Sequence, residues 1–232
     1  GNPSELYVYS VDGTFENTVT VNNQENTDWE DLSQDTNGNI YIGNFGNNDN
    51  KRKDLRILKV DAGSLTSNSV NASQETTFYY QDQTDFPPKK SNLLYDCEAF
   101  VATNDAFYLF TKNRSKGFDG TFYIYKVPNK NGNFKAEKIA TLQTCSQYKS
   151  CAITGAALNK NGNEIALLTH DKVLLIPFVN DDSFKQENIT IKELGHNSQK
   201  EAITFKSDKQ LFMADESEKG KKGGKVFVLD LN

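Results

Sequence analysis

Short apolar runs separated by polar turns recur along the whole chain. The runs are five to eight residues long and rich in Tyr, Phe, Ile, Val and Leu. Asn, Gly, Asp or Lys residues bound them, and turn sequences such as VDG, TNGN and NKNGN stand between them. The periodicity of a long amphipathic helix is hard to find anywhere in the chain. The pattern therefore predicts β-strands joined by tight turns.

Four segments share one order of features: strand, short turn, strand, polar loop, strand. They cover residues 28–61, 96–128, 152–179 and 199–232. Further strands are expected at 5–11 and 17–23, and after the first three segments at 75–81, 137–144 and 188–194. A four-stranded antiparallel unit that repeats in this way is typical of a β-propeller. We therefore predict an all-β fold, a single β-propeller domain over residues 1–232, with five blades, or six as the alternative.

The strand count sets an expectation for the ends of the ring. The pattern supplies 17 candidate strands, whereas five complete blades need about 20. The first blade is expected to be incomplete at the N-terminus, and the last blade to lack its outer strand.

Polar and charged side chains gather where the first strand of each unit begins and the second ends. In a propeller these two points meet at one mouth of the central channel, so residues far apart along a hairpin become neighbours. The predicted binding residues at this mouth are Asp28, Glu30, Asp31, Asn44, Asn47, Asp96, Glu98, Lys112, Arg114, His170, Glu201 and Glu216.

Three interpretations of this ring stay open. Glu30, Glu98 and Glu201 hold equivalent repeat positions, and each could bind backbone N–H groups of the next blade as a structural staple. The same three glutamates could be metal ligands, because carboxylate and amide oxygens suit calcium. The acids, together with Lys112, Arg114 and His170, could instead hold a small ligand. The recurrence of a glutamate at the same position in three units favours the structural role, because structural roles recur between repeats and catalytic roles usually do not.

Composition and charge narrow the functional classes. The formal net charge is −5, and the basic runs NKRKD and EKGKKGGK are short, so nucleic acid is not an expected partner. No run approaches the roughly 18 apolar residues that span a membrane. We also see no cleavable export signal in the given sequence.

Cysteine spacing suggests one disulfide. Cys145 and Cys151 flank SQYKS and could close a small loop, which would imply an oxidising compartment. The alternative is two free thiols near the start of a strand. Cys97, within LLYDCEAFV, is expected to be a buried and unpaired small side chain.

Several motifs resemble those of a family of exported bacterial β-propellers. They are DWEDLSQDTNGNIYIGNFGNN, YDCEAFVATNDAFYLFTK, ITGAALNKNGNEIALLTHDKVLL and KEAITFKSDKQLFMADE. Members of that family are often lipoproteins, are usually uncharacterised, and relate loosely to phytase-like esterase, TolB-like and NHL-type propellers. The resemblance implies a place at the bacterial cell surface or in the periplasm, with a lipid anchor outside the given sequence. Asn44 and Asn47 stand where the family commonly has Asp, which weakens a metal site.

Two functions follow as expectations. The first is a non-catalytic, exported binding or scaffold propeller that holds a small ligand or a partner protein at the cell surface. The alternative is a calcium-dependent phytase-like or lactonase-like hydrolase, with Glu30, Glu98 and Glu201 near the metal and His170 as the base. Fold alone does not decide between them, because propellers host both functions.

Overall fold

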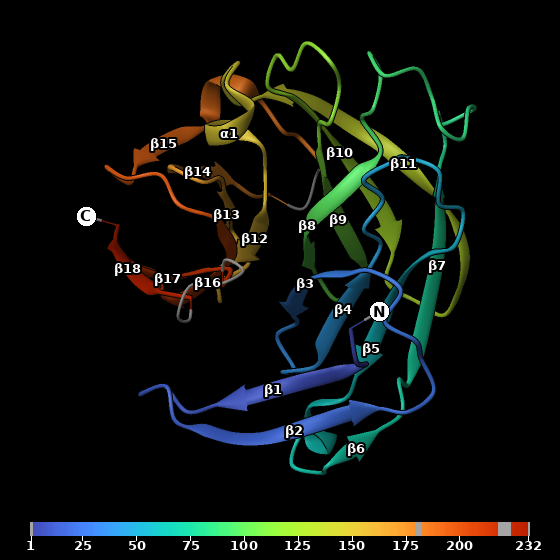
Figure 1. The fold of residues 1–232 in the computed structure, drawn as a ribbon. Helices are drawn as coiled ribbons and strands as arrows, with labels where there is room; N and C mark the ends of the chain where they lie inside the picture. Colours follow the sequence, from blue (N-terminus) through green and yellow to red (C-terminus); the bar gives the residue numbers. More distant parts are fainter. Residues whose placement is uncertain (1, 180–181, 218–223, 232) are drawn as a thin grey trace.

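The computed structural model describes residues 2–179, 182–217 and 224–231, and strands dominate it. The strands form sheets arranged around a central space (Figure 1). Helix in these ranges is confined to the four-residue α1 (Tyr148–Cys151) and the 3₁₀ turns η1 (Ala62–Ser64) and η2 (Gln186–Asn188). Nowhere in the described ranges is a helix long and apolar enough to cross a bilayer. The predicted all-β class is confirmed.

The strands follow the predicted runs, and four sheets are formed within the described residues. The first sheet contains β1 (Glu5–Tyr9), β2 (Phe15–Val21) and β6 (Ser69–Val70). The largest contains, in spatial order, β3 (Trp29–Gln34), β4 (Ile40–Asn44), β5 (Leu55–Val60), β7 (Gln74–Tyr80), β11 (Gly132–Gln143), β10 (Thr121–Pro128), β9 (Ala106–Lys112) and β8 (Asp96–Ala102). The third contains β12 (Gly155–Leu158), β13 (Glu164–Leu168), β14 (Lys172–Pro177) and β15 (Thr190–Glu193). The last contains β16 (Lys200–Ser207), β17 (Gln210–Asp215) and β18 (Val226–Asp230).

The largest sheet differs from the prediction of separate four-stranded blades. Its two halves, β3-β4-β5-β7 and β8-β9-β10-β11, are each antiparallel, as expected. They are joined because β7 pairs in parallel with β11, with Phe78 opposite Phe134. The two outer strands thus connect what the repeat pattern predicts as two units into one continuous eight-stranded sheet.

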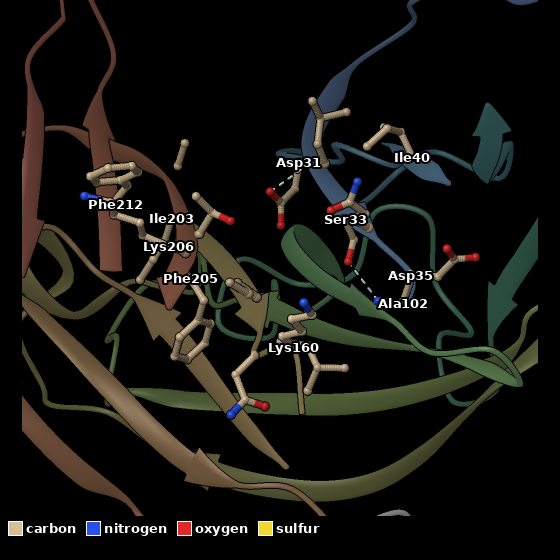
Figure 2. A pocket seen from close by; sticks show the side chains of 18 of the residues that line it. Asp31, Ser33, Asp35, Ile40, Ala102, Lys160, Ile203, Phe205, Lys206 and Phe212 are labelled. Atoms are coloured by element: carbon tan, nitrogen blue, oxygen red, sulfur yellow. Dashed lines mark hydrogen bonds between the residues drawn. The ribbon is translucent and has the colours of Figure 1, made fainter. Parts of the chain in front are cut away.

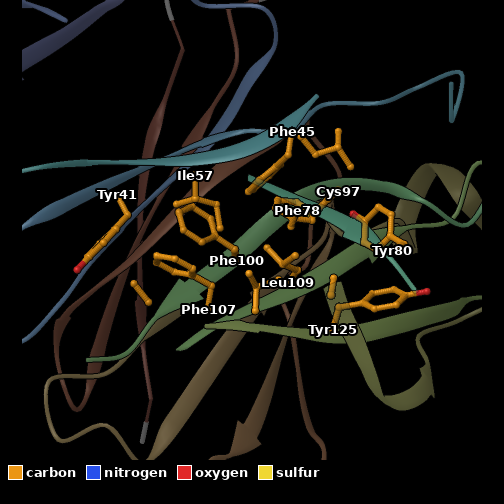
Figure 3. Packing of buried hydrophobic residues seen from close by; sticks show 14 of the residues in the cluster. Tyr41, Phe45, Ile57, Phe78, Tyr80, Cys97, Phe100, Phe107, Leu109 and Tyr125 are labelled. Atoms are coloured by element: carbon orange, nitrogen blue, oxygen red, sulfur yellow. The ribbon is translucent and has the colours of Figure 1, made fainter. Parts of the chain in front are cut away.

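Apolar clusters fill the space between successive groups of strands. One joins the first sheet to the β3–β7 half, and another lies between the two halves of the large sheet. Figure 3 shows that second cluster, where Phe45, Phe78, Phe100 and Phe107 pack together. Two more clusters join β8–β11 to β12–β14, and β12–β14 to β16–β18. Successive side chains of a strand point to opposite faces of its sheet, so one group of strands can pack against the groups on both sides of it.

Strands β3, β8, β12 and β16 lie innermost and contact one another around the middle of the molecule (Figure 1). They begin at Trp29, Asp96, Gly155 and Lys200, close to the predicted starts. Trp29 packs against the cluster between the first two groups of strands. The innermost strands carry the candidate site at their first residues.

Candidate functional site

Hairpin pairing brings the predicted acids to one end of the innermost strands. The first residue of β3, Trp29, pairs with the last residue of β4, Asn44. In the same way Asp96 pairs with Lys112, and Lys200 pairs with Asp215. The start of the first strand and the end of the second therefore meet, as the repeat geometry predicts. We call this end the channel mouth.

Glu30, Glu98 and Glu201 share a backbone feature at this mouth. In each of the three hairpins that carry these glutamates, the pairing register shifts at the glutamate. The shifts lie between residues 29 and 31, 97 and 99, and 200 and 202. Each glutamate is thus the extra residue of a β-bulge, which interrupts the in-and-out alternation and redirects a side chain. In β12, Gly155 holds the equivalent position and the register runs without a shift.

An ion-pair network occupies one side of the mouth. The guanidinium of Arg114 donates from Nε to Asp96 Oδ2 at 2.6 Å and from Nη2 to Glu98 Oε1. Lys112 Nζ donates to the other oxygen of Glu98. The backbone N–H of Asn47 donates to Asp96 Oδ1 at 2.8 Å. Both carboxylates are buried, and all four of their oxygens are engaged.

Glu30 and Asp28 approach each other over Gly46. A Cβ atom on Gly46 would overlap both Glu30 Oε1 and Asp28 Oδ2, so these two oxygens share the space that the glycine leaves open. Arg52 donates from Nη1 to the Gly46 carbonyl at 2.7 Å and holds this backbone in place. Burial raises the pKa of Asp28, against the opposing charge of Arg52. We call Asp28 and Glu30 the carboxyl dyad.

Glu30 and Glu98 have different pKa values because their surroundings differ. Burial, followed by the charges of Glu98 and Asp96, raises the pKa of Glu30 to about 9. Burial raises the pKa of Glu98 only to about 7, because Lys112 and Arg114 oppose it. Glu30 is therefore protonated at neutral pH while carboxylates stand beside it. A buried acid held in its protonated form at neutral pH is a candidate proton donor.

Asn44 and Asn47 have structural roles at the mouth. Asn44 accepts from the Asp28 N–H at 3.2 Å and donates to the Glu25 carbonyl at 2.9 Å. Asn47 accepts from the Arg52 N–H at 2.9 Å and donates to a backbone carbonyl of residue 95. Their amides therefore hold the GNFGNN loop against its neighbours.

The staple role falls on Asp31 and Ser33, one and three residues beyond Glu30. Asp31 Oδ2 accepts from the Phe100 N–H at 3.1 Å, and Ser33 Oγ accepts from the Ala102 N–H at 2.9 Å. Figure 2 shows the contact of Ser33 with Ala102. These bonds tie β3 to β8. Bonds of the kind predicted for Glu30 are thus made by Asp31 and Ser33. The carboxylate of Glu98 accepts from Lys112 and Arg114.

His170, Glu201 and Glu216 make contacts of their own, separate from those of the carboxyl dyad. His170 Nε2 stands 3.5 Å from Glu201 Oε1. Glu216 is exposed and bonded by Gln199, so it belongs to the rim. The predicted ring thus separates into the network with the dyad on one side and the His170 group on the other.

The donor set does not fit the predicted calcium site. Within the described ranges, no three His, Cys, Asp or Glu side chains are grouped as ligands of one metal ion. Lys112 and Arg114 take the oxygens of Glu98, and Glu201 faces His170. Calcium needs six to eight oxygens, and the three glutamates offer too few that are free of cations.

A cavity of about 1440 Å³ runs along the innermost strands. Glu30, Asp31 and Glu201 line it near the mouth. Figure 2 shows its wall further along, with Asp31 and Ser33 on one side and Phe205 and Phe212 on the other. Both Glu30 and Glu201 therefore contact one volume large enough for a small molecule.

The predicted disulfide is present. Cys145 and Cys151 are bonded, and Cys97 is a buried free thiol, as expected. Sequence reasoning missed three contributors to the mouth: Gly46, Arg52 and Tyr148. Gly46 lies inside GNFGNN and Arg52 follows it closely, and the two glycines of this short run were a usable signal. Tyr148 lies inside the disulfide loop, and nothing in the repeat pattern marks it.

Comparison with known proteins supports the fold alone. No protein-family model matches the sequence, and no curated protein matches it. Among solved structures, the PQQ-bound aldose sugar dehydrogenase of Streptomyces coelicolor is similar with a TM-score of 0.50 and 8% identity, over 97% of this chain and 70% of that one. The periplasmic gluconolactonase of Pseudomonas aeruginosa is similar with a TM-score of 0.49 and 13% identity, over 100% of this chain and 66% of that one. Hydrazine synthase of Kuenenia stuttgartiensis is similar with a TM-score of 0.45 and 12% identity, over 90% of this chain and 49% of that one.

At such low identity the likeness concerns architecture. The sugar dehydrogenase has a β-propeller fold, and this chain has antiparallel strand groups around a central cavity. The chain is therefore an all-β protein of propeller type.

Proposed function

We propose that this protein is a hydrolase that cleaves a small polar ester or lactone at the channel mouth by carboxyl acid–base chemistry. The observation that carries the proposal is the carboxyl dyad: Glu30 lines the cavity, carries its proton at neutral pH and shares the space over Gly46 with Asp28. Two carboxyl groups this close do not both ionise, so one can give a proton while the other takes one.

The proposed roles follow from the two environments. Asp28, beside Arg52, is the base that takes a proton from water as the water oxygen bonds to the carbonyl carbon. Glu30 is the acid that gives its proton to the departing alkoxide oxygen as the C–O bond breaks. The products are a carboxylic acid and an alcohol, and one proton passes back between the two carboxyl groups to restore the dyad. No metal takes part in this scheme.

A non-catalytic binding protein is the second candidate. It is favoured by the network around Arg114, in which Asp96 and Glu98 already bond cations and have no oxygen left for chemistry. In that case the cavity holds a ligand and the dyad orients it.

We further propose a five-bladed arrangement in an extracytoplasmic compartment. Support for the blades comes from five groups of strands and the four apolar clusters between them. Support for the compartment comes from the disulfide between Cys145 and Cys151, because such bonds persist in oxidising surroundings.

Hydrolysis of a substrate panel tests the function. The panel contains sugar-acid lactones, p-nitrophenyl carboxylic esters and p-nitrophenyl phosphate. We expect turnover of a lactone or a carboxylic ester, reduced about 100-fold in kcat by Glu30→Gln. Glu5→Gln is the matched control, since Glu5 lines the same cavity but lies on β1. No turnover across the panel, or full turnover by Glu30→Gln, would overturn the proposal in favour of a binding protein.

A further inference from the structure

The disulfide closes a loop that reaches both sides of the channel mouth. Residues 145–151 include helix α1, and the Tyr148 hydroxyl accepts from Arg114 Nη1 at 3.0 Å. The Tyr148 ring packs edge-on against Phe118, with centroids 5.4 Å apart. On this side the loop therefore contacts the ion-pair network.

On the other side the loop presents a backbone carbonyl to His170. The carbonyl oxygen of Lys149 lies 3.0 Å from His170 Nδ1 and also accepts from Asn197 Nδ2 at 3.2 Å. A carbonyl oxygen accepts and never donates, so the bond requires a proton on Nδ1. The loop thereby determines which ring nitrogen of His170 holds the permanent proton.

The other ring nitrogen faces Glu201. Nε2 of His170 is buried, makes no hydrogen bond, and stands 3.5 Å from Glu201 Oε1. Glu201 in turn lines the cavity that Glu30 lines. A continuous series of groups therefore runs from the Lys149 carbonyl through His170 to Glu201 and the cavity.

We propose that Glu201 is a second proton-transfer group of the cavity and that His170 is its positioning residue, with its tautomer set by the disulfide loop. The inference rests on the proposed hydrolase function. A proton that Glu201 takes from a substrate hydroxyl group in the cavity passes to Nε2, which makes His170 an imidazolium with Nδ1–H on the Lys149 carbonyl and Nε2–H on Glu201. The proton returns to the same oxygen by the same route, so no other reactant is required, and the transfers made by Asp28 and Glu30 are unchanged.

The position of Glu201 at a β-bulge supports this role. The bulge redirects its side chain, and its neighbour Lys200 is buried, with Nζ donating to the His170 carbonyl at 3.0 Å. The backbone of His170 is therefore held from β16 while its ring is held from the loop. A histidine restrained at both ends is suited to positioning a partner carboxylate.

Nitrogen NMR tests the tautomer without any substrate. The chain has two histidines, so His196→Gln assigns the ring resonances of His170 in ¹⁵N-labelled protein. We expect the oxidised protein to carry the His170 proton on Nδ1. We expect Cys145→Ser/Cys151→Ser, or reduction of the wild type, to lose that preference. Glu201→Gln keeps the loop intact and is the matched control in which Nδ1–H should persist.

Kinetics separate this inference from the proposed function. If the protein hydrolyses a panel substrate, Glu201→Gln should lower kcat about tenfold or more with little change in KM. Unchanged kcat in Glu201→Gln, while Glu30→Gln is inactive, would overturn the role of Glu201 and leave the dyad in place. An Nε2–H tautomer in the oxidised protein, or the same tautomer in the oxidised and the cysteine-free protein, would overturn the role of the loop.

Discussion

The carboxylate of Asp31 accepts a hydrogen bond from the backbone N–H of Phe100, across the boundary between two innermost strands, at 3.1 Å. The N–H of Leu32 donates to its other oxygen at 2.8 Å. Burial raises the pKa of Asp31 well above its usual range, against these two hydrogen bonds. Asp31 therefore joins β3 to β8 chiefly as a hydrogen-bond acceptor.

Replacing Asp31 should reveal this joining role. Asp31→Leu leaves the N–H of Phe100 without an acceptor, which should cost about 1 to 3 kcal/mol of unfolding free energy. Asp31→Asn keeps one oxygen acceptor and should cost less. Urea unfolding of both variants measures the difference, and equal stability of the two would contradict the assignment.

Glu30→Gln should change how stability depends on pH. The pKa of Glu30 is raised from 4.5 to about 9 in the folded protein, so the folded state holds a proton that the unfolded state has lost between these values. The stability that this proton contributes is fully present below pH 4.5 and is lost as the pH rises to about 9. One proton gives a slope of at most about 1.4 kcal/mol per pH unit.

Gln mimics the protonated acid and cannot ionise. Unfolding free energies at pH 5, 7 and 9 should therefore fall less steeply for Glu30→Gln than for the wild type. Parallel curves would mean that Glu30 ionises normally in the folded protein.

Gly46→Ala should disturb the carboxyl dyad at little cost to the fold. The added Cβ meets Glu30 and Asp28, whose side chains can rotate away, so the loss of stability should stay near 1 kcal/mol. Gly43→Ala is a contrasting control, because its Cβ meets the buried ring of Phe45 and should cost up to about 3 kcal/mol. Hydrolysis should fall in Gly46→Ala although the protein stays folded. An unimpaired Gly46→Ala enzyme would place the chemistry elsewhere.

Glu98→Gln should destabilise the protein equally with and without calcium. The variant loses charge-assisted bonds from Lys112 and Arg114, worth about 1.5 to 3 kcal/mol. A metal bound only by the folded state would raise the melting temperature of the wild type. Thermal unfolding with and without added calcium should show no such rise, and a rise abolished by Glu98→Gln would restore the metal interpretation.

Much of the fold could be predicted because each strand carries its own apolar run between turn residues. The parallel pairing of β7 with β11 could not, since it joins outer strands far apart in sequence whose residues carry no mark of their partner. The convergence of Glu30 with Glu98 was predictable from hairpin geometry. The β-bulges at Glu30 and Glu98 were not predictable, because an extra residue in one strand depends on how that strand pairs with its neighbour. That shift is why the staple lies on Asp31 and not on Glu30.

The most direct test of the account is the titration of the Glu30 carboxyl group itself. Carbon NMR of ¹³C-labelled protein follows each side-chain carboxyl through the pH range, and Glu30→Gln identifies its resonance. We expect Glu30 to stay protonated through neutral pH and to titrate near pH 9, with burial as the first cause. A Glu30 resonance that titrates near its usual value of about 4.3 would contradict the carboxyl dyad and the hydrolase proposal built on it.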